Sequence, residues 1–144
     1  MRLSQNSFYW CAWIVALAAM GGSLYFSQIM HLTPCTLCWY QRILMYPLTI
    51  FIGIGIFRRN RELPLYVLPF SLIGVGVATY HYLLQLGLVG ESAKFCTSMV
   101  SCTDRFINYY GFITIPFMSL IAFVFITIAM LFALRAKRER SREG

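Results

Sequence analysis

The chain has 144 residues, of which 59% are hydrophobic, 17% aromatic and only 12% charged. Disordered chains are poor in aromatic residues and rich in charge, so this composition excludes that class. The net charge of +7 comes with too little polar sequence to build the basic soluble face of a nucleic-acid binder, so we expect a small integral membrane protein of one domain.

Four apolar runs follow one another along the chain. A helix that spans a membrane needs about 20 mostly apolar residues. Three runs have this length: 8–29, 65–86 and 112–134. The second run, Ile43–Phe57, has only 15 residues, and it reaches the required length if its helix begins near Cys35 or Trp39. Such a start places Gln41 and Arg42 inside the helix, near one membrane face.

These runs predict an all-α membrane protein in which four helices form an up-down bundle, because lipid-exposed backbone must be hydrogen-bonded internally. The expected single domain, 1–144, has helices at 8–29, 39–57, 65–86 and 112–134, loops at 30–38, 58–64 and 87–111, and a tail at 135–144. Nine of the twelve Lys and Arg residues lie before the first helix, in 58–64 or in the tail. The positive-inside rule therefore places both termini in the cytoplasm and the loops 30–38 and 87–111 outside it.

The five cysteines are not scattered over this topology. Cys35 and Cys38 lie in the first outer loop, and Cys96 and Cys102 lie in the second. Cysteines on the oxidising side of a membrane are expected to be redox active or bridged. Four cysteines allow three connectivities, of which the short spacings favour pairing within each loop. Cys11 lies inside the first helix, where we expect a buried small apolar residue.

The Cys-x-x-Cys spacing brings two sulfurs to one face of a helix. Thr33 and Pro34 indicate an N-cap followed by proline at the first helical position. The pair Cys35–Cys38 then lies at the positive end of the helix dipole, which stabilises the reactive thiolate. Arg42 lies one turn beyond Cys38 on the same face, where its guanidinium adds to this effect.

The cysteines also permit two other interpretations, a zinc site and a pair of structural disulfides. A zinc site needs four ligands, but Cys96-x5-Cys102 is a poor second half, and adding His31 or His81 gives no standard pattern. We therefore expect no metal. Two inert structural disulfides are the other possibility, although a bridge within Cys-x-x-Cys closes a loop too small to stabilise much. An arginine at membrane depth is also costly unless it is used.

Thiols that cycle need an electron acceptor. The sequence lacks a dinucleotide fingerprint, a haem attachment motif and iron–sulfur spacing. What lies beside a thiol pair at the lipid boundary is the membrane quinone pool, menaquinone or ubiquinone. Arg42 and His81 are suited to hold a quinone oxygen and its developing negative charge. A histidine in a spanning helix is a functional candidate, but His81 could equally make a hydrogen bond across the bundle.

The segment Cys35-Thr-Leu-Cys38-Trp-Tyr-Gln-Arg42 resembles the signature of the disulfide bond formation protein B (DsbB) family of bacterial membrane thiol oxidases. The resemblance covers the whole chain, including the second cysteine pair between the third and fourth helices. The runs Gln41-Arg-Ile-Leu-Met-Tyr-Pro47 and Tyr109-Tyr-Gly-Phe-Ile-Thr-Ile-Pro116 are most similar to the Bdb-type, BdbC-like branch, which has a short second outer loop.

The resemblance implies a role for each cysteine of the two pairs. Cys96 matches the cysteine that forms a mixed disulfide with a thioredoxin-like partner, and Cys102 matches its bridge partner. Cys35 and Cys38 match the pair that passes electrons to quinone, with the Cys38 thiolate at the quinone ring. The second pair differs from that of the best-known members, whose cysteines lie far apart in a longer loop.

The remaining implications concern the pocket and the function. Arg42 matches the arginine beside the quinone, and His81 resembles a pocket histidine. The implied function is that of a dithiol:quinone oxidoreductase in the bacterial cytoplasmic membrane. It would reoxidise an extracytoplasmic thiol oxidase of the DsbA or BdbD type and so support disulfide formation in secreted proteins. The alternatives are the same relay run as a reductase, or a non-catalytic assembly or metal-handling protein with two structural disulfides.

Overall fold

The computed structural model describes residues 2–31, 35–88, 90 and 114–143. These residues contain four helices: α1 (Arg2–Gln28), α2 (Thr36–Phe57), α3 (Leu63–Gln85) and α4 (Ile115–Glu143). Each of the four includes a stretch that is long and apolar enough to cross a membrane. The predicted all-α fold with four spanning helices is therefore confirmed.

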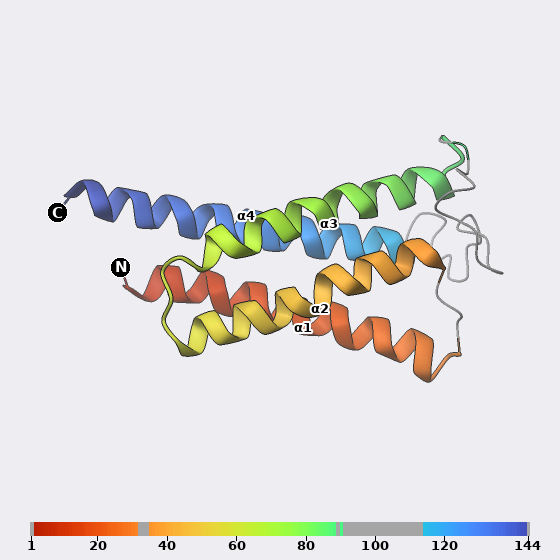
Figure 1. The fold of residues 1–144 in the computed structure, drawn as a ribbon, viewed down its shortest axis with the longest axis horizontal. Coiled ribbons are helices and arrows are strands. Elements are labelled where there is room, and N and C mark those ends of the chain that lie inside the picture. Colours follow the sequence, from red (N-terminus) through yellow and green to blue (C-terminus); the bar gives the residue numbers. More distant parts are fainter. Residues whose placement is uncertain (1, 32–34, 89, 91–113, 144) are drawn as a thin grey trace.

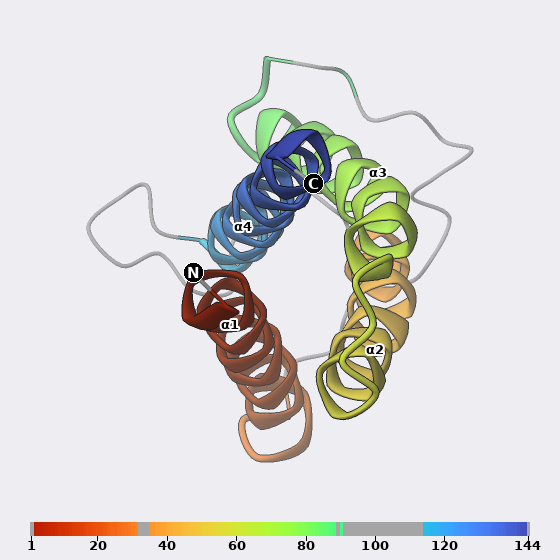
Figure 2. The same ribbon diagram turned by 90° about the vertical axis from the view of Figure 1, so that its left-hand side faces the viewer.

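The helices run along the long axis of the molecule (Figure 1). Seen from one end, they form a ring in chain order, and each helix packs against its two neighbours, with α4 against α1 (Figure 2). Both chain termini lie at one end of the bundle, which we call the terminal end (Figure 1). We call the other end, where α2 and α4 begin, the cysteine end. The side of the membrane that each end faces stays a prediction.

Several helix ends differ from the expected bounds. α4 continues to Glu143, past residue 134, and α1 begins at Arg2 rather than near residue 8. The expectation followed hydrophobicity, but Arg, Lys, Glu and Ala make up most of residues 135–143, and these good helix formers carry α4 beyond its apolar part. α2 begins at Thr36 rather than at residue 39, which brings Cys38 into its first turn. The start expected for the fourth helix, residue 112, lies outside the described residues.

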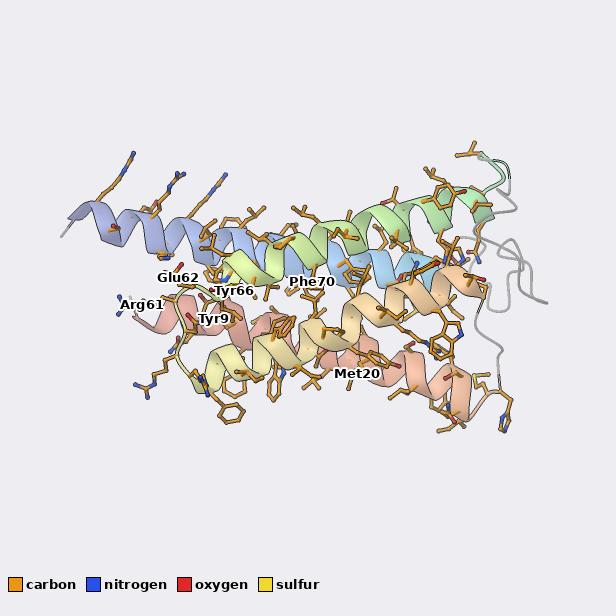
Figure 3. All side chains as sticks on the ribbon, viewed as in Figure 1. Tyr9, Met20, Arg61, Glu62, Tyr66 and Phe70 are labelled. Carbon is orange, nitrogen blue, oxygen red and sulfur yellow. The ribbon has the colours of Figure 1, made fainter. Side chains whose placement is uncertain are left out.

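The connection between α2 and α3 is a compact turn that ends one helix and starts the next. Arg59 has a φ of 49°, in the left-handed region. Its N–H donates to Ile56 O at 3.2 Å, and the Asn60 N–H donates to Gly55 O at 2.9 Å. These two bonds form a Schellman motif, which satisfies the last carbonyls of α2. The turn therefore places α3 antiparallel beside α2. Next to it, Lys137 of α4 pairs with Glu62, which Figure 3 labels.

The half of the bundle toward the terminal end holds a closely packed apolar core. Its buried side chains come from all four helices and include Tyr9, Ala12, Leu48, Ile52, Leu63, Val67, Ile126 and Met130. Glycine permits two of the closest approaches, because a Cβ at Gly55 would overlap Leu63 and a Cβ at Gly74 would overlap the Phe123 ring. In lipid such close packing takes over much of the role that hydrophobic burial has in water.

Cys11 contradicts its prediction. It is exposed on the outside of α1 rather than buried in the bundle. The physical reason is that lipid is as apolar as a protein core, so a small apolar residue fits either face of a spanning helix. The expectation that Cys11 takes no part in the chemistry is not tested by this position.

Candidate functional site

The first cysteine pair lies at the start of α2. Cys35 is the N-cap residue, with extended backbone (φ −70°, ψ 169°) and no side-chain cap, and Cys38 lies in the first turn. The N-cap is thus two residues later than the predicted Thr33; Thr33 and Pro34 lie outside the described residues. The pair still lies at the N-terminal end of the helix, where the dipole favours a thiolate.

The two sulfurs are close but not bonded. Cys35 Sγ and Cys38 Sγ are 3.1 Å apart and share a hydrogen bond between free thiols. A disulfide has its sulfurs about 2.05 Å apart, so an approach of roughly 1 Å closes the bond. The spacing of the two cysteines at the start of α2 therefore holds them close enough for the pair to interconvert between dithiol and disulfide.

His81 reaches this pair from α3. Its Nε2 lies 3.6 Å from Cys35 Sγ, and the side chains of both residues are buried. On the other side of the ring, His81 Nδ1 lies 3.2 Å from Gln41 Nε2. Ser119 of α4 in turn donates from Oγ to Gln41 Oε1 at 2.9 Å. A continuous series of polar contacts, which we call the polar chain, thus joins four residues: Cys35, His81 of α3, Gln41 of α2 and Ser119 of α4.

These neighbours change the acidity of Cys35, which lies just before the spanning segment of α2. The hydrogen bond from Cys38 holds the pKa of the Cys35 thiol well below its ordinary value, and His81 lowers it further through a hydrogen bond and its charge. Burial opposes both effects but is outweighed. Cys35 is therefore suited to exist as a thiolate near neutral pH.

Arg42 is half-buried one turn further along α2. Its Nη2 donates to the backbone oxygen of Ser23 on α1 at 2.9 Å, and its guanidinium carbon lies 5.7 Å from the centre of the Trp39 ring. These contacts fix the guanidinium between α1 and α2. In the described part of the chain only one of its several N–H donors is used in this way, so the others can bind a ligand.

A cavity of about 350 Å³ opens beside these residues, between the helices in the half of the bundle toward the cysteine end. Its polar lining includes Cys35, Cys38, Gln41, Arg42, His81 and Ser119. The rest of the wall is mostly apolar and includes Met20 of α1, labelled in Figure 3, and Phe123 of α4. Cavities of about 300–1,000 Å³ with a few polar groups in an apolar wall are typical of small-molecule sites.

The same atoms also resemble part of a metal site. Cys35 Sγ, Cys38 Sγ and a ring nitrogen of His81 all lie within 4.8 Å of one another. His31 is exposed and does not join this group. A structural zinc site closes with four ligands, and the described residues bring only three together. The expectation of no metal stays a prediction.

The structure thus brings together Cys35, Cys38, Arg42 and His81, as the sequence predicts for one site. The second predicted pair, Cys96 and Cys102, lies outside the described residues. Two members of the polar chain, Gln41 and Ser119, were not predicted to have a role. Gln41 stands out in the sequence only as a polar residue within a helix, and a serine in an apolar run is too common to carry a signal.

Comparison with known proteins now decides the family. The model of the family described as disulfide bond formation protein DsbB matches residues 5–133. The chain belongs to the DsbB family. It is similar to disulfide bond formation protein C of Bacillus subtilis, with 50% identity over 123 residues, which are 85% of this chain and 89% of the relative. No solved structure matches the chain significantly.

Two further relatives are similar over a comparable share of the chain. A protein of Halalkalibacterium halodurans described as a probable disulfide formation protein C is 50% identical over 127 residues, covering 88% of this chain and 92% of the relative. A Bacillus anthracis protein, probable disulfide formation protein C 1, is 40% identical over 126 residues, covering 88% and 91%. The resemblance seen in the sequence is confirmed, and the chain is a multi-pass membrane protein of a disulfide-forming family.

Proposed function

We propose that this chain is a membrane thiol–disulfide oxidoreductase that oxidises an extracytoplasmic thioredoxin-like dithiol protein and delivers the electrons to membrane quinone. The observation that best supports the proposal is the position of the Cys35–Cys38 pair, which lines a cavity inside the bundle beside Arg42. A structural disulfide needs neither a cavity nor a half-buried guanidinium, so the non-catalytic alternative leaves both unexplained.

The residues around the cavity fit a quinone ring. The wall is mostly apolar, the volume is about 350 Å³, and Arg42 supplies N–H donors with a positive charge. When bound, menaquinone or ubiquinone would accept the two electrons and two protons that leave as Cys35 and Cys38 form a disulfide. Arg42 would hold a ring oxygen, with Cys38 beside it. His81 lines the same cavity, but both of its ring nitrogens already have side-chain partners.

The chain's own cysteines would carry the electrons by thiol–disulfide exchange. A thiolate of the reduced partner attacks Cys96 and breaks the Cys96–Cys102 bond, and the partner's second thiol then displaces Cys96. The partner leaves with a disulfide, and Cys96 and Cys102 are left as thiols. These reduce the Cys35–Cys38 disulfide in the same two-step way. The helix dipole and the low pKa of Cys35 keep that sulfur reactive.

A quinone-reduction assay with the purified protein in lipid nanodiscs tests this function. A reduced thioredoxin-like dithiol protein and a soluble quinone are added, and quinone loss is followed by its absorbance. We expect turnover by the unchanged protein and none above background by Cys38→Ser. Cys11→Ala, which alters an exposed cysteine on the outside of α1, is the matched control and should turn over normally. Normal turnover by Cys38→Ser would refute the proposal.

A further inference from the structure

The polar chain behind Cys35 contains a serine with two hydrogen-bond neighbours that both accept. Ser119 Oγ lies 2.9 Å from Gln41 Oε1 and 2.9 Å from the backbone oxygen of Pro116. A hydroxyl has one hydrogen, whereas the Pro116 carbonyl can only accept. Ser119 therefore cannot donate fully to both neighbours at once.

A half-turn of the Gln41 carboxamide removes this conflict. The amide oxygen and nitrogen are nearly alike in shape, so the rotation keeps both contacts of Gln41 and exchanges their roles. Ser119 then donates to Pro116 and accepts from the Gln41 amide. After the rotation, the Gln41 oxygen takes the place of the amide nitrogen, which lies 3.2 Å from His81 Nδ1. The oxygen therefore faces His81 Nδ1. Each of these contacts then pairs one donor with one acceptor.

This orientation decides which nitrogen of His81 carries the hydrogen. Because the Gln41 oxygen accepts, Nδ1 must donate, and the neutral ring then has a free lone pair on Nε2. Nε2 is the atom that lies 3.6 Å from Cys35 Sγ. We propose that His81 Nε2 takes the proton of the Cys35 thiol, and that Gln41 and Ser119 are positioning residues that keep Nε2 free for it.

The proton transfer is balanced within the site. The S–H bond of Cys35 breaks and an N–H bond forms at His81 Nε2. The products are a thiolate and an imidazolium, and neither residue is oxidised or reduced. The charged ring keeps its Nδ1–H bond to Gln41, so the positioning residues suit both states of His81. When Cys35 and Cys38 later form their disulfide, His81 releases this proton to the acceptor; in that respect the proposal rests on the proposed function.

Burial explains why an internal base is needed. The side chains of Cys35 and His81 are only 5% and 1% exposed, so a proton leaving the thiol cannot pass directly to bulk water. The lowered pKa of Cys35, to which His81 contributes, agrees with a thiolate–imidazolium pair. The distance between the two atoms is already within the range of a hydrogen bond to sulfur.

Other charged or titratable groups near the pair must be included in any pH experiment. Cys38, Arg42 and Tyr46 of α2 line the same cavity. Among the described residues, α3 contributes His81 and Gln85 to the lining, and the cavity residues of α1 and α4 are all uncharged. His81 is therefore the only base in this described lining whose ordinary pKa lies near neutrality.

The test measures the titration of Cys35 itself, without quinone or partner. The fully reduced chain in nanodiscs is alkylated briefly with iodoacetamide at a series of pH values, and tandem mass spectrometry reports the rate at Cys35. Because only the thiolate reacts, the rate follows the fraction of Cys35 that has lost its proton. In the unchanged protein we expect the rate to persist well below the ordinary thiol pKa.

Three variants separate the proposed roles. His81→Asn and Gln41→Leu should each shift the Cys35 profile to higher pH by about one unit or more, so that the rate at a pH below the midpoint of the unchanged protein falls at least about tenfold. Gln41→Glu, which can accept from Nδ1 but cannot donate to it, should stay close to the unchanged protein. If instead Gln41→Glu behaves like Gln41→Leu, Nδ1 is an acceptor and the proposed tautomer is wrong.

Serine variants provide a matched control for packing. Ser71 is buried on α3 and donates to Leu68 O at 3.0 Å, as Ser119 does to its own helix, but it lies ten residues before His81 and is not a member of the polar chain. Ser119→Ala should shift the Cys35 profile upward and Ser71→Ala should not. Equal profiles for these two variants and for His81→Asn would overturn the proposal. If the Cys35 profiles are as expected but the protein does not reduce quinone, the proposed function is wrong and the role of His81 stands.

Discussion

The two halves of the bundle are made of similar apolar helices but are packed in different ways. Toward the terminal end, Leu48, Ile52 and Val67 have no exposed surface, and glycines bring the helices into direct contact. Toward the cysteine end, the same four helices enclose a cavity and a chain of buried polar side chains. The comparison teaches that one half can hold the helices together while the other half keeps room for chemistry.

The contrast predicts that arginines at the two ends differ in importance. Arg42→Ala removes charged donors from the cavity, and a hydrogen bond to a charged group contributes about 1.5–3 kcal/mol, so the apparent KM for quinone should rise roughly 10- to 100-fold. Quinone titrations in the nanodisc assay measure this. Arg58→Ala, at the exposed turn after α2, is the control and should leave KM unchanged. An unaltered KM in Arg42→Ala would remove Arg42 from the site.

Filling the cavity sharpens the comparison further. Gly21 and Gly22 are neighbours on α1 with open space around each, but only Gly22 lines the cavity. Gly22→Leu should therefore lower quinone turnover about tenfold or more by occupying space that the ring needs. Gly21→Leu places the same side chain on an exposed face and should be nearly silent. Equal turnover by both variants would mean that quinone is used elsewhere.

The closely packed half should respond in stability instead of activity. Gly55→Ala introduces a methyl group against the Leu63 side chain, which does not line the cavity, and overpacking of this kind costs about 1–3 kcal/mol. Gly76 of α3 has open space around it and gives the control Gly76→Ala, which should not destabilise. Thermal unfolding of both variants in one detergent measures the difference. Equal stability would show that the apparent close packing there is loose.

The sequence predicts the fold well because membrane spans leave a strong signal in hydrophobicity. It also predicts that Cys35, Cys38 and Arg42 share a face, since they lie on one helix at turn-like spacing. It could not place His81 on Cys35, because that contact depends on how α3 packs against α2. The side of α1 that Cys11 faces was predicted wrongly for a related reason: hydrophobicity does not distinguish lipid from core.

The roles of Gln41 and Ser119 were beyond prediction for a different reason. Each is an ordinary polar residue in its own helix, and only the meeting of α2, α3 and α4 makes them a chain. The expected end of α4, residue 134, is too early because a helix can extend past the membrane on good helix formers alone. Contacts between helices, which carry much of the chemistry here, leave little trace in the pattern of any one helix.

A single-turnover experiment on the cavity pair alone bears most closely on the proposed chemistry. The variant with Cys11, Cys96 and Cys102 all replaced by alanine keeps only Cys35 and Cys38; it is reduced, placed in nanodiscs and mixed with quinone. We predict that one quinone is reduced for each protein molecule and that mass spectrometry finds a Cys35–Cys38 disulfide. A folded variant that keeps both thiols free and reduces no quinone would contradict the proposal that this pair is the electron donor.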